Sequence, residues 1–148
     1  MKNLLILFMF LISSCGYQPL YSKKNSDNFI FKNINSQGDK KVNRYIISAM
    51  SFKKNSENYF YEELNINSKK SIVKTAKDAK GKPVSFKMIL EINLKIEDKQ
   101  NKSKEQIFSK EFLYENIDNK FDLSEYEVDL EKNLINQIIE EIIIYLNI

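Results

Sequence analysis

The chain of 148 residues carries 23 lysine and arginine residues against 20 aspartate and glutamate residues, with one cysteine and neither histidine nor tryptophan. This near balance of charge argues against nucleic-acid binding through a basic surface. Without histidine, and with a single thiol, metal sites of the His or Cys type, Cys or His catalysis and a serine triad are excluded. Only carboxylate or lysine chemistry could remain, and we expect no cofactor and no metal.

The first residues have the pattern of a bacterial secretory signal. Lys2 supplies the positive start, and an apolar run of nine residues, 4–12, ends at two serines that precede Cys15. About 20 apolar residues are needed to span a bilayer, so this run is too short for a membrane helix. The pattern predicts a signal peptide over residues 1–14 that is removed from the mature protein.

The predicted localisation depends on Cys15. Ile-Ser-Ser-Cys at residues 12–15 resembles the bacterial lipobox, whose cysteine is acylated and becomes the first residue of the mature chain. Acyl chains bind a membrane with about 0.8 kcal/mol per buried CH₂. A buried or disulfide-seeking cysteine is the alternative. Gly16 stands where an aspartate resembles a signal for staying in the inner membrane, so we expect an outer-membrane anchor and a domain that faces the periplasm.

The mature chain divides into a tether and one domain. Residues 22–28 are polar and lack periodicity, which is typical of a tether, and residues 15–28 together form the lipidated N-terminus and tether. Residues 29–148 fit a single periplasmic domain with a modest core. Because no disulfide can form within the chain, this core alone must hold the domain together.

The domain begins with a predicted strand and a predicted helix. Residues 29–34 form a short apolar and aromatic run, which indicates a strand. From Ser36 the spacing of apolar residues changes to that of an amphipathic helix, and Ser36 with Asp39 resembles an N-terminal cap. The apolar positions of this helix are Val42, Tyr45, Ile46, Ala49 and Met50.

Three further strands are predicted, at residues 59–67, 86–97 and 107–117. The first has an irregular continuation through Ile72 and Val73, and a turn over residues 78–83 follows it, marked by Gly81 and Pro83. The second alternates with a period of two over twelve residues, with one exception on its polar face. One face of that strand must therefore be buried.

A long amphipathic helix is predicted at the end of the chain. It begins near Asp122 or Ser124, each of which can cap it together with an acidic residue three positions later. Its apolar stripe consists of Leu130, Leu134, Ile138, Ile142 and Tyr145, with Ile135, Ile139 and Leu146 beside it. We interpret its acidic residues mainly as a solvated face.

The predicted order of elements is β-α-β-β-β-α. Two helices cannot pack against each other and also cover both faces of one sheet, so both are expected on the same face. This predicts an α+β fold, a two-layer sandwich of a four-stranded mixed sheet with two helices on one face. The other face of the sheet is then expected to be polar, exposed and rich in lysine.

The heptad Cys-Gly-Tyr-Gln-Pro-Leu-Tyr at residues 15–21 resembles the mature start of the LPS-assembly lipoproteins, the LptE family. Members commonly begin Cys-Gly-Phe or Cys-Gly-Tyr and continue through Pro-Leu. The order of elements, the long alternating strand after Gly81 and the terminal amphipathic helix are similar to that family as well.

The resemblance implies a non-enzymatic lipoprotein of the outer membrane. Such a protein plugs the lumen of the LptD barrel, helps this partner to assemble, and contacts lipopolysaccharide on its way to the outer leaflet. The chain differs from better-known members in having little arginine, so their basic residues cannot be transferred to it one for one. The alternative function is a periplasmic lipid-binding accessory lipoprotein of another envelope transport system.

Two groups of residues are candidates for contacts. Seven lysines near the predicted turn would attract the phosphates of lipopolysaccharide, or they form a solvated turn and a protected edge strand. These lysines are Lys69, Lys70, Lys74, Lys77, Lys80, Lys82 and Lys87. Next to the anchor, Tyr17, Leu20 and Tyr21 are expected to contact the membrane or the partner barrel. The aromatic residues 59–61 fit either core packing or a partner contact.

Overall fold

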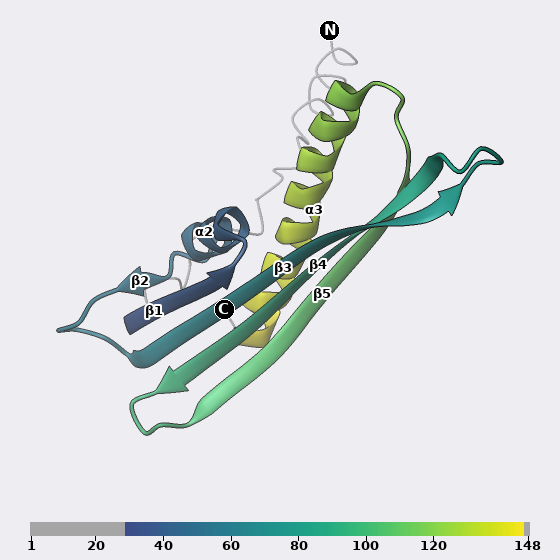
Figure 1. Ribbon diagram of the computed structural model, residues 1–148. Coiled ribbons are helices and arrows are strands. Elements are labelled where there is room, and N and C mark those ends of the chain that lie inside the picture. Colours follow the sequence, from purple (N-terminus) through teal and green to yellow (C-terminus); the bar gives the residue numbers. More distant parts are fainter. Residues whose placement is uncertain (1–28, 147–148) are drawn as a thin grey trace, which may run out of the picture.

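The computed structural model describes residues 29–146, and Figure 1 shows how they are arranged. In chain order the elements are β1 (Ile30–Gly38), α2 (Lys40–Ala49), β2 (Lys53–Lys54), β3 (Tyr61–Lys77), β4 (Pro83–Asp98), β5 (Ser103–Glu115) and α3 (Lys120–Leu146). The predicted order β-α-β-β-β-α is confirmed, with β2 as an additional strand. The predicted signal peptide, the lipidation of Cys15 and the contacts of Tyr17, Leu20 and Tyr21 lie outside the described residues.

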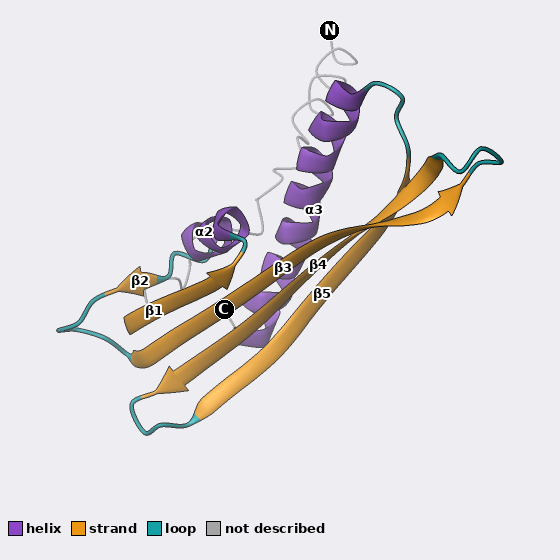
Figure 2. Cartoon of the chain, in the orientation of Figure 1, coloured by secondary structure: helices purple, strands orange, loops and turns teal. Residues whose placement is uncertain are grey.

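The strands form one mixed sheet in the order β2-β1-β3-β4-β5. β1 runs parallel to β2 and β3, whereas β3, β4 and β5 are successive antiparallel neighbours. Both helices lie on the same face of the sheet (Figure 2), so the predicted α+β two-layer sandwich is confirmed. The sheet has five strands rather than four because Lys53 and Lys54 pair with the start of β1. Two residues are too few to produce a sequence period.

β4 provides the centre of the apolar face. Its alternate residues Met88, Leu90, Ile92, Leu94 and Ile96 are buried, as the predicted period of two requires. The helices cover them with buried residues of α2 and α3, among them Val42, Ile46, Leu134, Ile138 and Ile142. Each large apolar side chain that is fully buried stabilises the fold by about 1.5–3 kcal/mol. The core therefore lies between the sheet and the two helices.

α2 begins later than the sequence predicts. Ser36 is part of β1, where it pairs with Ile66 of β3, so its prediction as a helix cap is wrong. Asp39 caps the helix instead, because its side chain accepts hydrogen bonds from the backbone N–H groups of Lys41 at 2.9 Å and Val42 at 3.1 Å. The strand continues through polar residues because one face of the sheet is open to solvent.

The junction between β1 and α2 is closely packed against β3. Gly38 has a φ of +84°, and a Cβ at this position would lie 1.8 Å from the backbone oxygen of Ser68. Ser68 in turn binds the cap residue, since its Oγ accepts from Asp39 N at 3.0 Å and donates to Asp39 O at 3.1 Å. Only glycine fits the conformation and the space at residue 38.

α3 begins at Lys120, slightly before its predicted start. Asn119 caps it by accepting a hydrogen bond from Phe121 N at 3.0 Å, so neither Asp122 nor Ser124 is the cap. The predicted apolar stripe packs against the sheet from Leu130 onward, whereas no earlier residue of α3 is buried. The first turns of α3 contact the core more loosely, through the partly buried Leu123 and through Tyr126, which packs on Tyr114. Within residues 29–146, no helix has the length and apolarity needed to cross a membrane.

Candidate functional site

The β3–β4 hairpin extends beyond the rest of the sheet (Figure 1) and ends in the predicted turn. Asp78 organises this turn, because its Oδ1 accepts hydrogen bonds from Lys80 N at 2.9 Å and Lys82 N at 2.8 Å. Gly81 supplies the left-handed conformation, with a φ of +81°, and no atom lies within 4 Å of a Cβ built there. The turn predicted at residues 78–83 is thereby confirmed as an ordered, projecting tip.

The seven candidate lysines do not lie on one surface. Neighbouring residues of a strand point to opposite faces of the sheet. Lys69 is paired across the strands with Glu91 on the open face, and Lys70 is paired with Leu90 on the face that the helices cover. The strand geometry therefore divides the lysines between the two faces and the hairpin tip.

Three of the seven lysines form ion pairs: Lys70 with Glu131, Lys82 with Asp118, and Lys87 with Glu111. The remaining four have no acidic partner among the described residues. Of these, Lys74, Lys77 and Lys80 lie at the projecting end of the β3–β4 hairpin. These three, named here the hairpin lysines, lie near the tip and can meet an anionic ligand there, whereas Lys69 is exposed on the open face of the sheet.

Lys82 connects the hairpin tip to the segment that precedes α3. Its Nζ donates a hydrogen bond to Asp118 Oδ1 at 2.8 Å. This hydrogen bond, together with the charge of Asp118, raises the pKa of Lys82 and lowers the pKa of Asp118. Because both side chains are largely exposed, solvent screens the pair, and it holds the hairpin only loosely.

An open groove of about 590 Å³ runs between α2 and α3. It combines apolar and cationic side chains, and the residues that line it are Lys41, Arg44, Tyr45, Ser48, Val128, Glu131, Lys132 and Ile135. Apolar surface next to several cations suits a ligand that has an anionic group and an apolar part. The sequence analysis missed this groove because its two walls are distant in the chain.

Glu131 lies at the bottom of the groove and is 3% exposed, so its assignment to a solvated acidic face is wrong. Its Oε2 accepts a hydrogen bond from Lys70 Nζ at 2.5 Å, and its Oε1 lies 3.8 Å from Lys41 Nζ. A buried carboxylate needs such cationic partners to stay charged. A signal was present in the sequence, because residue 131 lies one helical turn before Leu134 and Ile135 and so shares their apolar face.

Tyr45 bridges the two helices beside this groove. It is 37% exposed rather than buried on the predicted apolar face of α2, and Ala49 is exposed as well. The Tyr45 hydroxyl donates a hydrogen bond to Asn136 Oδ1 of α3 at 3.1 Å. This hydrogen bond connects α2 to α3 beside the groove.

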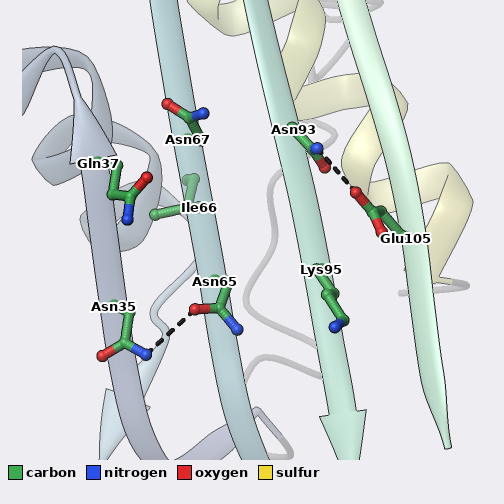
Figure 3. A pocket seen from close by; sticks show the side chains of 8 residues that line it. All are labelled: Asn35, Gln37, Asn65, Ile66, Asn67, Asn93, Lys95 and Glu105. Atoms are coloured by element: carbon green, nitrogen blue, oxygen red, sulfur yellow. Dashed lines mark hydrogen bonds between the residues drawn. The ribbon is translucent and has the colours of Figure 1, made fainter.

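The open face of the sheet has amides at its centre rather than the expected lysines. A shallow hollow of about 150 Å³ there (Figure 3) is lined by Asn35, Gln37, Asn65, Ile66, Asn67, Asn93, Lys95 and Glu105. Asn35 Nδ2 donates to Asn65 Oδ1 at 3.1 Å, and Asn93 Nδ2 donates to Glu105 Oε1 at 2.8 Å. Amides both donate and accept hydrogen bonds, so this surface suits a polar partner of little net charge.

The aromatic residues 59–61 are divided between the core and the surface. Tyr61 is partly buried and stacks on Phe29, with ring centroids 5.5 Å apart and an angle of 4° between the planes. Phe60 is 58% exposed, and the Tyr59 ring lies 4.5 Å from Lys99 Nζ. Tyr61 thus contributes to core packing, whereas Phe60 remains available to a partner.

Two further acidic side chains, Glu141 and Glu62, form ion pairs with lysines. Glu141 pairs with Lys110, and Glu62 pairs with Lys32, whose hydrogen bond lowers the pKa of Glu62. No three His, Cys, Asp or Glu residues between residues 29 and 146 are grouped so that they could hold a metal ion. The surfaces described above can act through charge, hydrogen bonding and shape.

The domain resembles solved structures of bacterial lipoproteins. The crystal structure of rare lipoprotein B from Shewanella oneidensis is similar with a TM-score of 0.58 at 10% sequence identity, covering 80% of this chain and 96% of that one. The solution structure of the uncharacterized lipoprotein B from Nitrosomonas europaea has a TM-score of 0.59 at 11% identity, covering 76% and 77%. Neither the family models nor the curated proteins contain a match to the sequence.

This chain has the fold of lipoprotein B. At 10–11% identity the similarity concerns the fold, and it extends over most of both chains. The mixed sheet with two helices on one face is therefore an arrangement that bacterial lipoproteins use.

Proposed function

We propose that this chain is an outer-membrane lipoprotein, anchored through Cys15 and facing the periplasm, that plugs the LptD barrel and helps it to assemble. In this role it assists the insertion of lipopolysaccharide into the outer leaflet and catalyses no reaction. The observation that carries the proposal is the lipoprotein B fold directly behind a lipobox-like cysteine. The heptad at residues 15–21, which resembles the mature start of LptE proteins, supports the choice of partner.

The open face of the sheet supports binding inside a barrel. The interior of an outer-membrane barrel is polar, and its side chains include both donors and acceptors of hydrogen bonds. The amide groups of Asn35, Asn65, Asn67 and Asn93 can both donate and accept. A lipid anchor on Cys15 would restrict the domain to the bilayer surface and so raise its effective concentration for a barrel in that bilayer.

The hairpin lysines support a contact with lipopolysaccharide. Lys74, Lys77 and Lys80 lie on a projecting tip and form no ion pair with a described residue. Lysine binds phosphate as a point charge, and the lipid carries phosphates on lipid A and on the inner core sugars. In our proposal, these three side chains meet those phosphates.

A second candidate function is that of a lipid-binding accessory lipoprotein of another envelope transport system. The groove between α2 and α3 favours it, because Arg44 and Lys132 lie there beside the apolar side chains of Val128 and Ile135. In that case the groove binds the lipid, and no barrel is needed.

Depletion of the chain from cells separates the two candidates. If it assembles the barrel, LptD should fail to mature and newly made lipopolysaccharide should no longer reach the cell surface. As a control, a Gly16→Ala variant, which keeps Cys15, should restore both. Continued export of lipopolysaccharide, with mature LptD, would exclude the first candidate and favour the second.

A further inference from the structure

A second apolar groove, of about 270 Å³, opens at the end of the domain where the described chain begins. Its apolar walls are Phe29, Tyr61, Ile96 and Leu146, and its polar residues are Asp98, Lys102 and Lys104. An apolar cavity of about 150 Å³ can hold a benzene ring. This groove, named here the terminal groove, therefore has room for a tyrosine or leucine side chain.

We propose that residues 17–21, Tyr-Gln-Pro-Leu-Tyr, bind in the terminal groove of their own domain. Between Cys15 and Phe29, the only large apolar side chains are Tyr17, Leu20 and Tyr21, whereas residues 22–28 are all polar. Moving one such side chain from water into an apolar site is worth about 1.5–3 kcal/mol. The terminal groove is the apolar hollow closest along the chain, because Phe29 forms part of its wall.

The tether is long enough for this docking. Eight residue steps separate Tyr21 from Phe29, and an extended chain of that length spans about 27 Å. A connection of this length gives an effective concentration in the millimolar range, so the segment occupies the groove once its affinity exceeds about 4 kcal/mol, which corresponds to about 1 mM.

The chemistry of the segment complements the groove. The segment carries no charge that would oppose the lysines at the groove. A tyrosine hydroxyl can also donate to Asp98, whose Oδ1 already accepts from Gln100 N and Lys102 N while its other oxygen remains available.

Docking would orient the domain on the membrane. Cys15 is only five residues from Leu20, so its acyl chains would emerge beside the β4–β5 turn and the end of α3. The β3–β4 hairpin lies at the opposite end of β4 (Figure 1) and would point away from the bilayer. The docking itself does not depend on LptD or lipopolysaccharide. It can therefore fail while the proposed function holds, and it can hold while the proposed function fails.

The test uses the whole mature chain, residues 15–148, with Cys15→Ser so that only introduced thiols are present. Gln18→Cys is combined with Lys104→Cys at the terminal groove, so that Tyr17, Leu20 and Tyr21 are all retained. The matched control combines Ser26→Cys with Lys104→Cys, which places the first thiol closer to Phe29 along the chain. We expect the Gln18 pair to form its intramolecular disulfide at least about tenfold faster than the control.

Without docking, the Ser26 pair should form its disulfide faster, because the chain between its first thiol and Phe29 is shorter and closes more readily. An equal or faster rate for the Ser26 pair would therefore overturn the proposal. A second measurement compares amide NMR spectra of the Cys15→Ser chain before and after Tyr17→Ser, Leu20→Ser and Tyr21→Ser are added together. Docking requires shifts at Ile96, Leu146 and residues 102–104 but none at residues 78–82. Unchanged groove signals would assign these side chains to the membrane or to another protein instead.

Discussion

Glu131 of α3 and Lys70 of β3 form a hydrogen-bonded ion pair across the interface between the helix layer and the sheet. The Glu131 side chain is almost entirely buried, and apart from Lys70 its described cationic neighbour is Lys41 at 3.8 Å. A buried charge that loses its partner is strongly destabilising. This pair therefore links α3 to β3 beside the groove that Glu131 helps to line.

Replacing Lys70 by methionine should lower the free energy of unfolding by about 2 kcal/mol. The loss is below that for a fully buried pair because Lys70 is partly exposed and Lys41 stays near the carboxylate. The double variant Lys70→Met/Glu131→Met should recover most of it, since no unpaired charge is left. Urea denaturation measures both changes. A double variant less stable than Lys70→Met would contradict the importance of this pair.

Gly38→Ala should be more damaging than Gly81→Ala. Both residues have a positive φ, which costs about 1–2 kcal/mol for a residue with a Cβ. At residue 38 the new Cβ would also lie 1.8 Å from Ser68 O, whereas at residue 81 it meets nothing within 4 Å. We expect thermal or urea denaturation to show a loss of about 1 kcal/mol for Gly81→Ala and clearly more for Gly38→Ala. Equal losses would mean that the contact with Ser68 is unimportant.

Tyr114 should make the stability depend on alkaline pH. It is 4% exposed and its hydroxyl donates to Glu127 Oε1 at 2.6 Å. Burial, followed by this hydrogen bond, raises the pKa of Tyr114 above the ordinary value. The contribution is fully present below about pH 10, where a tyrosine in the unfolded chain is also neutral. Above that pH the unfolded tyrosine ionises first, so the free energy of unfolding falls as pH rises.

Tyr114→Phe is the variant that tests this dependence. It should cost about 1 kcal/mol near pH 7, the typical net value of one hydrogen bond. The free energies of unfolding of the two proteins should approach each other between pH 7 and 11, because the variant lacks the loss of stability at alkaline pH that Tyr114 causes. Lysines and the other tyrosines titrate in both proteins and cancel in the comparison. A difference in the free energy of unfolding that stays constant above pH 10 would contradict the role given to Tyr114.

The hairpin lysines should dominate binding of lipopolysaccharide in our proposal. Changing Lys74, Lys77 and Lys80 to glutamate reverses three charges at the projecting tip, and we expect affinity for purified lipopolysaccharide to fall at least about tenfold. The matched control changes Lys40, Lys54 and Lys120 to glutamate, which alters the net charge equally. Similar losses in both triple variants would indicate a general effect of charge, and unchanged affinity in both would remove the proposed contact.

The regular parts of the fold could be predicted from the sequence. Alternation from Met88 to Ile96 identified the central strand, and the stripe from Leu130 to Ile142 identified the long helix, because each pattern reports one buried face. Tyr61 to Lys77 proved longer than predicted, since its outer half extends past the core and has no buried face to produce a period. β2 could not be found, because it exists only through pairing with β1.

The candidate surfaces were harder to predict because they depend on the direction in which each side chain points as well as on its position in the sequence. Lys69 and Lys70 are adjacent in the sequence but lie on opposite faces of β3, which the period of two could have indicated. Glu131 was assigned to solvent from its acidic neighbours, although its spacing from Ile135 places it on the apolar face. The groove between α2 and α3 had no sequence signal, because only the packing of the two helices creates it.

Co-purification from outer membranes tests the proposed complex most directly. The full chain, tagged at its C-terminal end and extracted in mild detergent, should be recovered with LptD in a one-to-one complex by native mass spectrometry. A Cys15→Ser chain carried to the periplasm, which lacks the anchor, should yield less of this complex because its effective concentration at the membrane falls. Recovery of the lipidated chain as a free monomer, without LptD, would contradict the proposal.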